Sequence, residues 1–227
     1  MANLLEETQI LFDEQKRELE IYLSMLQIRN KPRKGSQSKQ RIETNMLRAS
    51  FILMLYSTVE AVVQKMIAEY CTNRLSDLFY ENLSPTLQER YIKAKFSELD
   101  LHSANHNAYL KKSKEIVEQL TTQQAISFSS RRLMKEHSPS GNIDNEYINT
   151  LLTQHWCIAY DNSLIPSTFS TIKRKRNELA HGERTFNEIG ADHTIAGDDD
   201  SSLSKYYTDI TNGLSYIIET VNNHPPY

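Results

Sequence analysis

Glycine and proline are scarce in this sequence, which contains six of each among its 227 residues. Nucleotide-binding proteins of the Rossmann and P-loop types cluster glycines where the backbone has to approach a phosphate group. Neither G-x-G-x-x-G nor G-x-x-x-x-G-K-[ST] occurs in the chain. The sequence therefore argues against a nucleotide-dependent dehydrogenase and against a P-loop NTPase.

Cysteine and long apolar runs are also rare. Cys71 and Cys157 are the only cysteines, too few for a disulfide framework or a four-cysteine zinc site. The longest apolar run, around residues 51–56, is far shorter than the roughly 20 residues of a membrane helix. The acidic N-terminus lacks the basic start of a signal peptide. We therefore expect a cytoplasmic protein with no membrane partner.

The formal net charge of −3 conceals an uneven distribution of charged residues. Residues 29–48 and 173–176 are basic, whereas residues 198–200 are three consecutive aspartates. Local basic stretches permit nucleic-acid binding but do not require it. The length and the 39% hydrophobic content are those of one globular domain with a substantial core.

Apolar residues recur with helical spacing along almost the whole chain. A seven-residue repeat predicts an N-terminal amphipathic helix within residues 1–28, from about residue 3, and the repeat consists of Leu5, Phe12, Leu19 and Leu26. A helix packed on the protein's own core is favoured over a coiled coil, because few apolar residues fill the second heptad position. A basic loop is expected over residues 29–44.

The remaining residues, 45–222, are predicted to form the helical core. Its central helix, at 45–70, is apolar on most faces. Further helices are predicted at about 84–96, 106–126, 144–155, 166–182 and from 201 or 202 onward. The capping box Thr185-Phe-Asn-Glu188 predicts one further helical turn. No alternating strand pattern occurs, so we expect a single all-α domain, a helical bundle with an extra N-terminal helix.

Arg176 falls on the apolar side of the helix that ends at Gly182, a residue suited to the left-handed position after a helix. At about 100° per residue, Arg176 shares an arc of roughly 80° with Phe169, Ile172 and Leu179. A guanidinium group on an apolar stripe needs an anionic or carbonyl partner. The predicted partner is Glu60, an ionisable residue within the apolar helix at 45–70.

Asn177 and His181 are four residues apart on a neighbouring face, within reach of the Arg176 side chain. Attack of a ribose 2′-hydroxyl on its phosphate needs a base, an acid for the leaving 5′-oxygen and cations for the phosphorane. Histidine titrates in the range that suits a base or an acid, and arginine offers a fork for phosphate oxygens. One chain supplies a single histidine, so pairing two copies of this helix would complete the site.

The motif Arg-Asn-Glu-Leu-Ala-His at 176–181 resembles the R-x4–6-H motif of the HEPN superfamily. Three stretches are similar to MAE-type HEPN-like nucleases of bacterial toxin–antitoxin and phage-defence loci, namely LYSTVEA at 55–61, SGNID at 140–144 and HGERTFNEIG at 181–190. The resemblance covers about residues 45–222 and is most specific over 176–190.

This resemblance implies a helical bundle, a homodimer whose two motifs face each other, and metal-independent endoribonuclease activity without a cofactor. The products would carry 2′,3′-cyclic phosphate or 3′-phosphate ends. The resemblance gives catalytic roles to Arg176, Asn177 and His181, with Glu60 in support. It also implies a toxin or phage-defence effector, with an antitoxin or neighbouring defence protein as partner. Toxins silenced by adenylylation carry tyrosine two residues after the motif histidine, where this chain has Glu183, which argues against that control.

The basic residues around the motif are predicted to contact RNA, although a solvated face would show the same pattern. They are Lys173, Arg174, Lys175 and Arg184. Unpaired RNA, with tRNA among the candidates, is the expected substrate because in-line attack needs a flexible backbone.

Two other features compete with the motif. Arg132 and His137 have the same spacing, but this copy lacks the asparagine and runs into a turn. His102 and His106 are spaced as metal ligands can be, but no third ligand follows at a useful spacing, so no metal is expected.

Two other functions stay open. A non-catalytic HEPN module would bind RNA, a nucleotide or a partner protein and would tolerate the loss of His181. A scaffold protein would assemble through its N-terminal leucine repeat, and deletion of residues 1–28 would then abolish oligomerisation. The nuclease interpretation instead expects dimer contacts near residues 173–184. At the level of single residues, Arg176 could serve only stability, as a partner of Glu60.

Overall fold

The structure is a computed structural model that describes residues 4–29, 37–75, 79–83, 85–96, 106–121, 142–195 and 201–224. These residues form helices, and no β-strand occurs among them, which confirms the predicted all-α class. The elements are α1 (Glu6–Arg29), α2 (Gln37–Tyr70), η1 (Cys71–Leu75), η2 (Tyr80–Asn82), α3 (Pro85–Phe96), α4 (His106–Thr121), α6 (Asn145–Asn149), η3 (Thr150–His155), η4 (Asn162–Leu164), α7 (Thr168–Ala180), α8 (Phe186–Gly190) and α9 (Ser201–Asn223).

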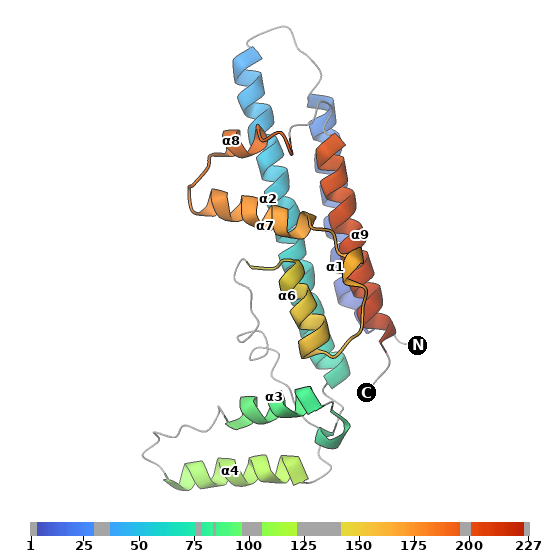
Figure 1. The fold of residues 1–227 in the computed structure, drawn as a ribbon, viewed down its shortest axis with the longest axis vertical. Coiled ribbons are helices and arrows are strands. Elements are labelled where there is room, and N and C mark those ends of the chain that lie inside the picture. Colours follow the sequence, from blue (N-terminus) through green and yellow to red (C-terminus); the bar gives the residue numbers. More distant parts are fainter. Residues whose placement is uncertain are drawn as a thin grey trace.

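Three long helices, α1, α2 and α9, run side by side (Figure 1). The seven-residue repeat of α1 faces the core, as predicted, since Leu5, Phe12, Leu19 and Leu26 are all buried. Helix α2 is central, because α1, α7, α8 and α9 all contact it. Its segment Ser38–Asn73 is long and apolar enough to cross a membrane, and half of the most apolar window is buried within the bundle. A central bundle helix has the same composition.

Polar contacts fix the N-terminal end of α1 against the rest of the bundle. The Glu69 carboxylate, at the end of α2, accepts hydrogen bonds from the backbone N–H groups of Glu7 (2.9 Å) and Thr8 (2.7 Å). The backbone N–H of Leu5 donates to the Asn222 side chain of α9 at 3.0 Å. The first N–H groups of a helix have no partner within the helix, so these bonds to α2 and α9 anchor α1.

The boundaries of two predicted elements are wrong. Helix α2 begins at Gln37, so the predicted loop at 29–44 is helical in its second half. Gly35 and Pro32 precede this start, and the polar residues after Gln37 are mostly good helix formers. The predicted helix at 144–155 becomes a π-helix, η3, after only five α-helical residues in α6.

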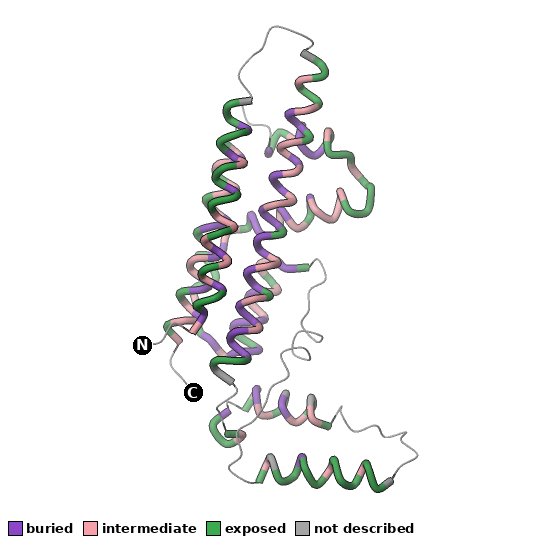
Figure 2. Tube along the Cα trace, turned by 180° about the vertical axis from the view of Figure 1, so that it is seen from behind, coloured by how far each residue is buried: buried purple, intermediate pink, exposed green. Residues whose placement is uncertain are grey.

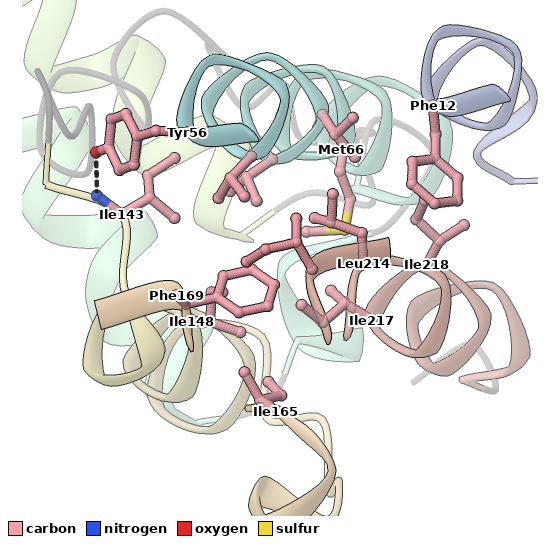
Figure 3. Packing of buried hydrophobic residues seen from close by; sticks show 14 of the residues in the cluster. Phe12, Tyr56, Met66, Ile143, Ile148, Ile165, Phe169, Leu214, Ile217 and Ile218 are labelled. Atoms are coloured by element: carbon pink, nitrogen blue, oxygen red, sulfur yellow. Dashed lines mark hydrogen bonds between the residues drawn. The ribbon is translucent and has the colours of Figure 1, made fainter. Parts of the chain in front are cut away.

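The shorter elements α6, α7 and α8 lie along one side of α2, whereas α3 and α4 lie beyond its end (Figure 1). Helix α4 is exposed along most of its length (Figure 2). Phe169 of α7 is fully buried and packs with Ile148, Ile165 and Leu214 (Figure 3). This contact joins α6 and α7 to α9 and sets the position of α7, the helix that carries the predicted motif.

Candidate functional site

The C-terminal end of α7 presents His181 at the surface. Gly182 adopts the left-handed conformation, with φ 70°, as predicted. Its N–H donates to the carbonyl of Leu179 at 3.2 Å, and the N–H of Glu183 donates to the carbonyl of Glu178 at 2.9 Å. These two bonds form a Schellman motif. The helix therefore stops directly after His181, whose side chain is exposed.

Arg176 is held by two contacts. Its Nη1 donates a hydrogen bond to the Asn177 side-chain oxygen at 3.2 Å. Its guanidinium carbon lies 5.5 Å from the centre of the Tyr56 ring, a cation–π distance. The Tyr56 ring, one helical turn before Glu60 on α2, is thus a partner of the guanidinium group, and the predicted contact between Arg176 and Glu60 stays a prediction. Glu60 stays close enough to act electrostatically on the same tyrosine.

Tyr56 connects α2 to the segment before α6. Its hydroxyl oxygen accepts a hydrogen bond from the backbone N–H of Ile143 at 3.1 Å (Figure 3). Burial raises the pKa of Tyr56 to about 12, and the charges of Glu60, Arg176 and Asp144 act on it as well. Tyr56 thus stays protonated near neutral pH. We expect it to position Arg176 and not to transfer protons.

Asp144 fixes the neighbouring part of α7. Its side chain caps α6 by accepting from the backbone N–H of Tyr147 at 2.9 Å, and it accepts from Lys173 Nζ at 2.5 Å. Burial opposes ionisation, but these bonds hold the pKa of the Asp144 carboxyl group below its usual value. The described parts of the three stretches at 55–61, 140–144 and 176–190 therefore connect through side chains around α7.

Lys175, and not Arg176, is the fully buried cation of α7. It is 1% exposed, and its Nζ lies 2.9 Å from Asp192 Oδ2. The predicted RNA contact of Lys175 is thus wrong in this structure. The buried arc of α7 also includes Thr168 and Lys175, so at about 100° per residue it extends about 40° beyond the predicted stripe, on the side away from Arg176.

Arg184 bonds to the same carboxylate, with its Nη1 3.1 Å from Asp192 Oδ2. It also donates to the Glu178 side chain at 3.3 Å and to the Glu188 carbonyl at 2.8 Å. Burial opposes ionisation, yet the hydrogen bonds from Lys175, Thr194 and Arg184 hold the pKa of Asp192 well below its usual range. Asp192 was not predicted as a site residue, because nothing in the local sequence marks an aspartate in a loop as the partner of a buried lysine.

The remaining predicted RNA contacts are largely paired within the chain. Lys173 bonds to Asp144, and Arg184 bonds to Glu178 and Asp192. Arg174 is the most exposed of them and lies 3.5 Å from Glu178 Oε1. RNA contact by these three residues stays a prediction.

The short helix α8 follows the motif and packs tightly on α2. It begins with the predicted capping box, in which the Thr185 side chain accepts from the backbone N–H of Glu188 and the Glu188 side chain accepts from that of Thr185. At Gly190, an added Cβ would lie 1.8 Å from the carbonyl oxygen of Asn45. Only glycine permits this approach.

A polar pocket of about 300 Å³ lies between the start of α7 and α9, and the predicted site residues do not line it. Its walls include Thr168, Thr194, Lys205 and Asp209. This pocket therefore lies at the opposite end of α7 from the motif.

The competing histidines lie mostly outside the described part of the chain. Arg132, His137 and His102 lie outside the described residues, and His106 is the first residue of α4. Within the described ranges, no group of three or more His, Cys, Asp or Glu side chains is arranged to hold a metal ion.

A family model described as RiboL-PSP-HEPN matches residues 12–223. The chain belongs to the RiboL-PSP-HEPN family. This confirms the HEPN identification, although the matching family is RiboL-PSP-HEPN whereas the sequence resembled the MAE type. Comparison with curated proteins gave no match, and neither did comparison with solved structures. The match begins at residue 12 and therefore includes most of α1.

Membership of the HEPN superfamily indicates an RNA-related function for this RiboL-PSP-HEPN protein. The end of α7 carries the Arg176 guanidinium group, which bonds to the Asn177 amide, and the exposed imidazole of His181 one turn later. Arginine suits phosphate oxygens, and histidine suits proton transfer near neutral pH.

Proposed function

We propose that this RiboL-PSP-HEPN protein is a metal-independent endoribonuclease that acts as a homodimer through Arg176, Asn177 and His181. The proposal rests on the Arg-Asn-Glu-Leu-Ala-His motif at 176–181, which lies inside a family match over residues 12–223. Arg176 is bonded to Asn177, and His181 is exposed where α7 ends.

In this reaction the 2′-oxygen of a ribose attacks the adjacent phosphorus, and the bond from phosphorus to the 5′-oxygen breaks. One histidine takes the proton of the 2′-hydroxyl, and a second gives a proton to the leaving 5′-oxygen. Arg176 stabilises the charge of the phosphorane, and Asn177 orients Arg176 or the phosphate. The products are a 2′,3′-cyclic phosphate end and a 5′-hydroxyl end.

The homodimer supplies the second histidine. His181, Gly182 and Glu183 are exposed at the end of α7, so a second copy has access to this end of the helix. A closed two-fold dimer brings the same residues of both copies together.

The biological role that we propose is that of a cytoplasmic toxin or phage-defence effector, controlled by an antitoxin or by a neighbouring defence protein. Unpaired RNA is the proposed substrate class, and tRNA loops belong to it. Accessible bases and a flexible backbone favour such substrates over duplex RNA.

The test incubates purified protein with total RNA and with tRNA in excess EDTA. Wild type is compared with His181→Ala, Arg176→Ala and the control His106→Ala. His106 is the first residue of α4, which lies beyond the end of α2 (Figure 1), so its variant removes a histidine away from the motif. Cutting by wild type and His106→Ala, but not by the motif variants, supports the proposal. Equal cutting by His181→Ala contradicts it.

The second candidate is a non-catalytic module that binds RNA, a nucleotide or a partner protein. The ion pairs that occupy Lys173, Lys175 and Arg184 favour it, because they leave fewer cations for an RNA backbone. Such a module would bind its ligand without cutting it, and His181→Ala would leave the affinity unchanged.

A further inference from the structure

The two basic residues that flank the motif bond to the same atom. Lys175 Nζ lies 2.9 Å and Arg184 Nη1 lies 3.1 Å from Asp192 Oδ2. Lys175 directly precedes Arg176, and Arg184 follows His181 by three residues. One carboxylate therefore links the residue before the three predicted catalytic residues to a residue shortly after them. We infer that Asp192 is a positioning residue that holds Arg176, Asn177 and His181 in their working arrangement, an inference that rests on the proposed function.

Asp192 is itself well anchored. Its second oxygen, Oδ1, accepts from the backbone N–H of Thr194 at 3.1 Å and from the Thr194 hydroxyl at 2.8 Å. Its backbone N–H donates to the carbonyl of Ile189, and its own carbonyl accepts from Ile195. Both isoleucines are fully buried. The carboxylate is thus fixed to the core. Its bonds can therefore hold the more exposed turn after α7 in one position.

The two cations depend on Asp192 to different degrees. Arg184 keeps the Glu178 carboxylate and the Glu188 carbonyl if Asp192 is lost. Asp192 is the ion-pair partner of Lys175, which is 1% exposed. A buried charge without its partner is strongly unfavourable, so the last turns of α7 would have to move to bring Lys175 to water. Arg176 is the next residue and would move with it.

The expected effect is on turnover rather than on RNA affinity, because Asp192 is bonded within the chain and reaches the substrate only through other residues. A misplacement of about 1 Å at a catalytic group can lower a rate about a hundredfold. We therefore expect Asp192→Asn to lower kcat by about ten- to a hundredfold, with KM changed less than about threefold.

The test uses a matched control at another buried carboxylate. Glu69 is 7% exposed and accepts three hydrogen bonds from Glu7 and Thr8. It lies near the end of α2, 13 residues after Tyr56, which is about 20 Å along the helix. Glu69→Gln thus disturbs a comparable polar anchor away from the motif. Both variants are compared with wild type at a temperature where all three are folded.

Two readouts separate positioning from general destabilisation. The first is kcat and KM for RNA cleavage in EDTA. The second is amide hydrogen exchange at His181, Gly182 and Glu183, whose N–H groups donate to carbonyls of α7. Asp192→Asn should lower kcat and the protection of these three amides, whereas Glu69→Gln should change neither. If Asp192→Asn does not fold, Asp192→Glu keeps a carboxylate for Lys175 but moves it outward by the length of one methylene group, and should lower kcat and the protection in the same direction.

The outcomes distinguish this inference from the proposed function. Unchanged protection and unchanged kcat in Asp192→Asn, with His181→Ala inactive, would overturn the inference alone. Equal losses in Asp192→Asn and Glu69→Gln would also overturn it. If wild type cuts no RNA, the proposed function fails, and hydrogen exchange alone decides whether Asp192 orders the motif.

Discussion

The long-helix bundle and the segment that carries the motif are held together in different ways. Helices α1, α2 and α9 meet through apolar side chains such as Phe12, Phe51 and Leu214. Residues 142–195 contain short elements, and buried or half-buried polar contacts of Asp144 and Asp192 tie them together. Apolar packing therefore dominates in the bundle, whereas the motif segment combines the apolar contact of Phe169 with ion pairs of Asp144 and Asp192.

The largest effect on the bundle is expected from Phe51→Ala. Phe51 is fully buried on α2 and stacks with Tyr22 of α1 at 5.9 Å between ring centres. Removing such a side chain lowers the free energy of unfolding by about 3–5 kcal/mol. Urea denaturation followed by circular dichroism measures this loss. It should be the same at pH 7 and at pH 4, because no charge is involved.

Asp192→Asn should instead cost about 3 kcal/mol at pH 7 and lose its effect in acid. The folded-state pKa of Asp192 is depressed, so its stabilisation is present above the unfolded pKa of about 4 and disappears as pH falls through the folded value. Urea denaturation of wild type and variant between pH 7 and pH 2 should show converging free energies. A difference that stays constant down to pH 2 would contradict this role.

Two glycine substitutions within the motif segment should have smaller and different effects on the free energy of unfolding. Gly190→Ala should lower the free energy of unfolding by about 1–3 kcal/mol or more, because its Cβ would meet the Asn45 carbonyl. The added Cβ of Gly182→Ala would meet no atom within 4 Å, but the backbone would keep a φ of 70°. This substitution should therefore cost only about 1–2 kcal/mol of backbone strain. Thermal unfolding of both variants tests the order, and an equal or reversed order would show that α8 does not pack closely on α2.

The smallest effect is expected from Thr185→Ala, which removes the capping box of α8. Loss of such a cap costs about 0.5–2 kcal/mol. Chemical denaturation should show a correspondingly small decrease, with cleavage by the proposed nuclease retained. A loss of cleavage at full folding would mean that α8 takes part in the site more directly.

Much of the bundle is predictable from the sequence, because helix periodicity is a local property. The repeat from Leu5 to Leu26, the end of α7 at Gly182 and the capping box at Thr185 all follow from spacing and residue type. The π-helix η3 and the early start of α2 were missed. At η3 the apolar spacing fits more than one helical form, and the mostly polar residues at the start of α2 show no apolar periodicity that would mark a helix.

The pairing of charges within the motif segment was not predictable. Counting angles along α7 placed Arg176 on the apolar stripe, but did not predict that its guanidinium group lies against the Tyr56 ring. The buried ion pair joins Lys175 to Asp192, which lies 17 residues further along the chain. Such pairs depend on how α7, the following loop and α8 pack together, and one sequence contains no local signal for it.

The most direct test of the proposed nuclease is the chemistry of its products in EDTA. An RNA that wild type cuts at one position is compared with the same RNA carrying a 2′-deoxy nucleotide there, and the fragments are analysed by mass spectrometry. The expected result is 2′,3′-cyclic phosphate and 5′-hydroxyl ends from the unmodified RNA, no cut at the 2′-deoxy position, and no fragments with His181→Ala. Cleavage of the 2′-deoxy RNA, or equal cleavage by His181→Ala, would contradict catalysis by this motif.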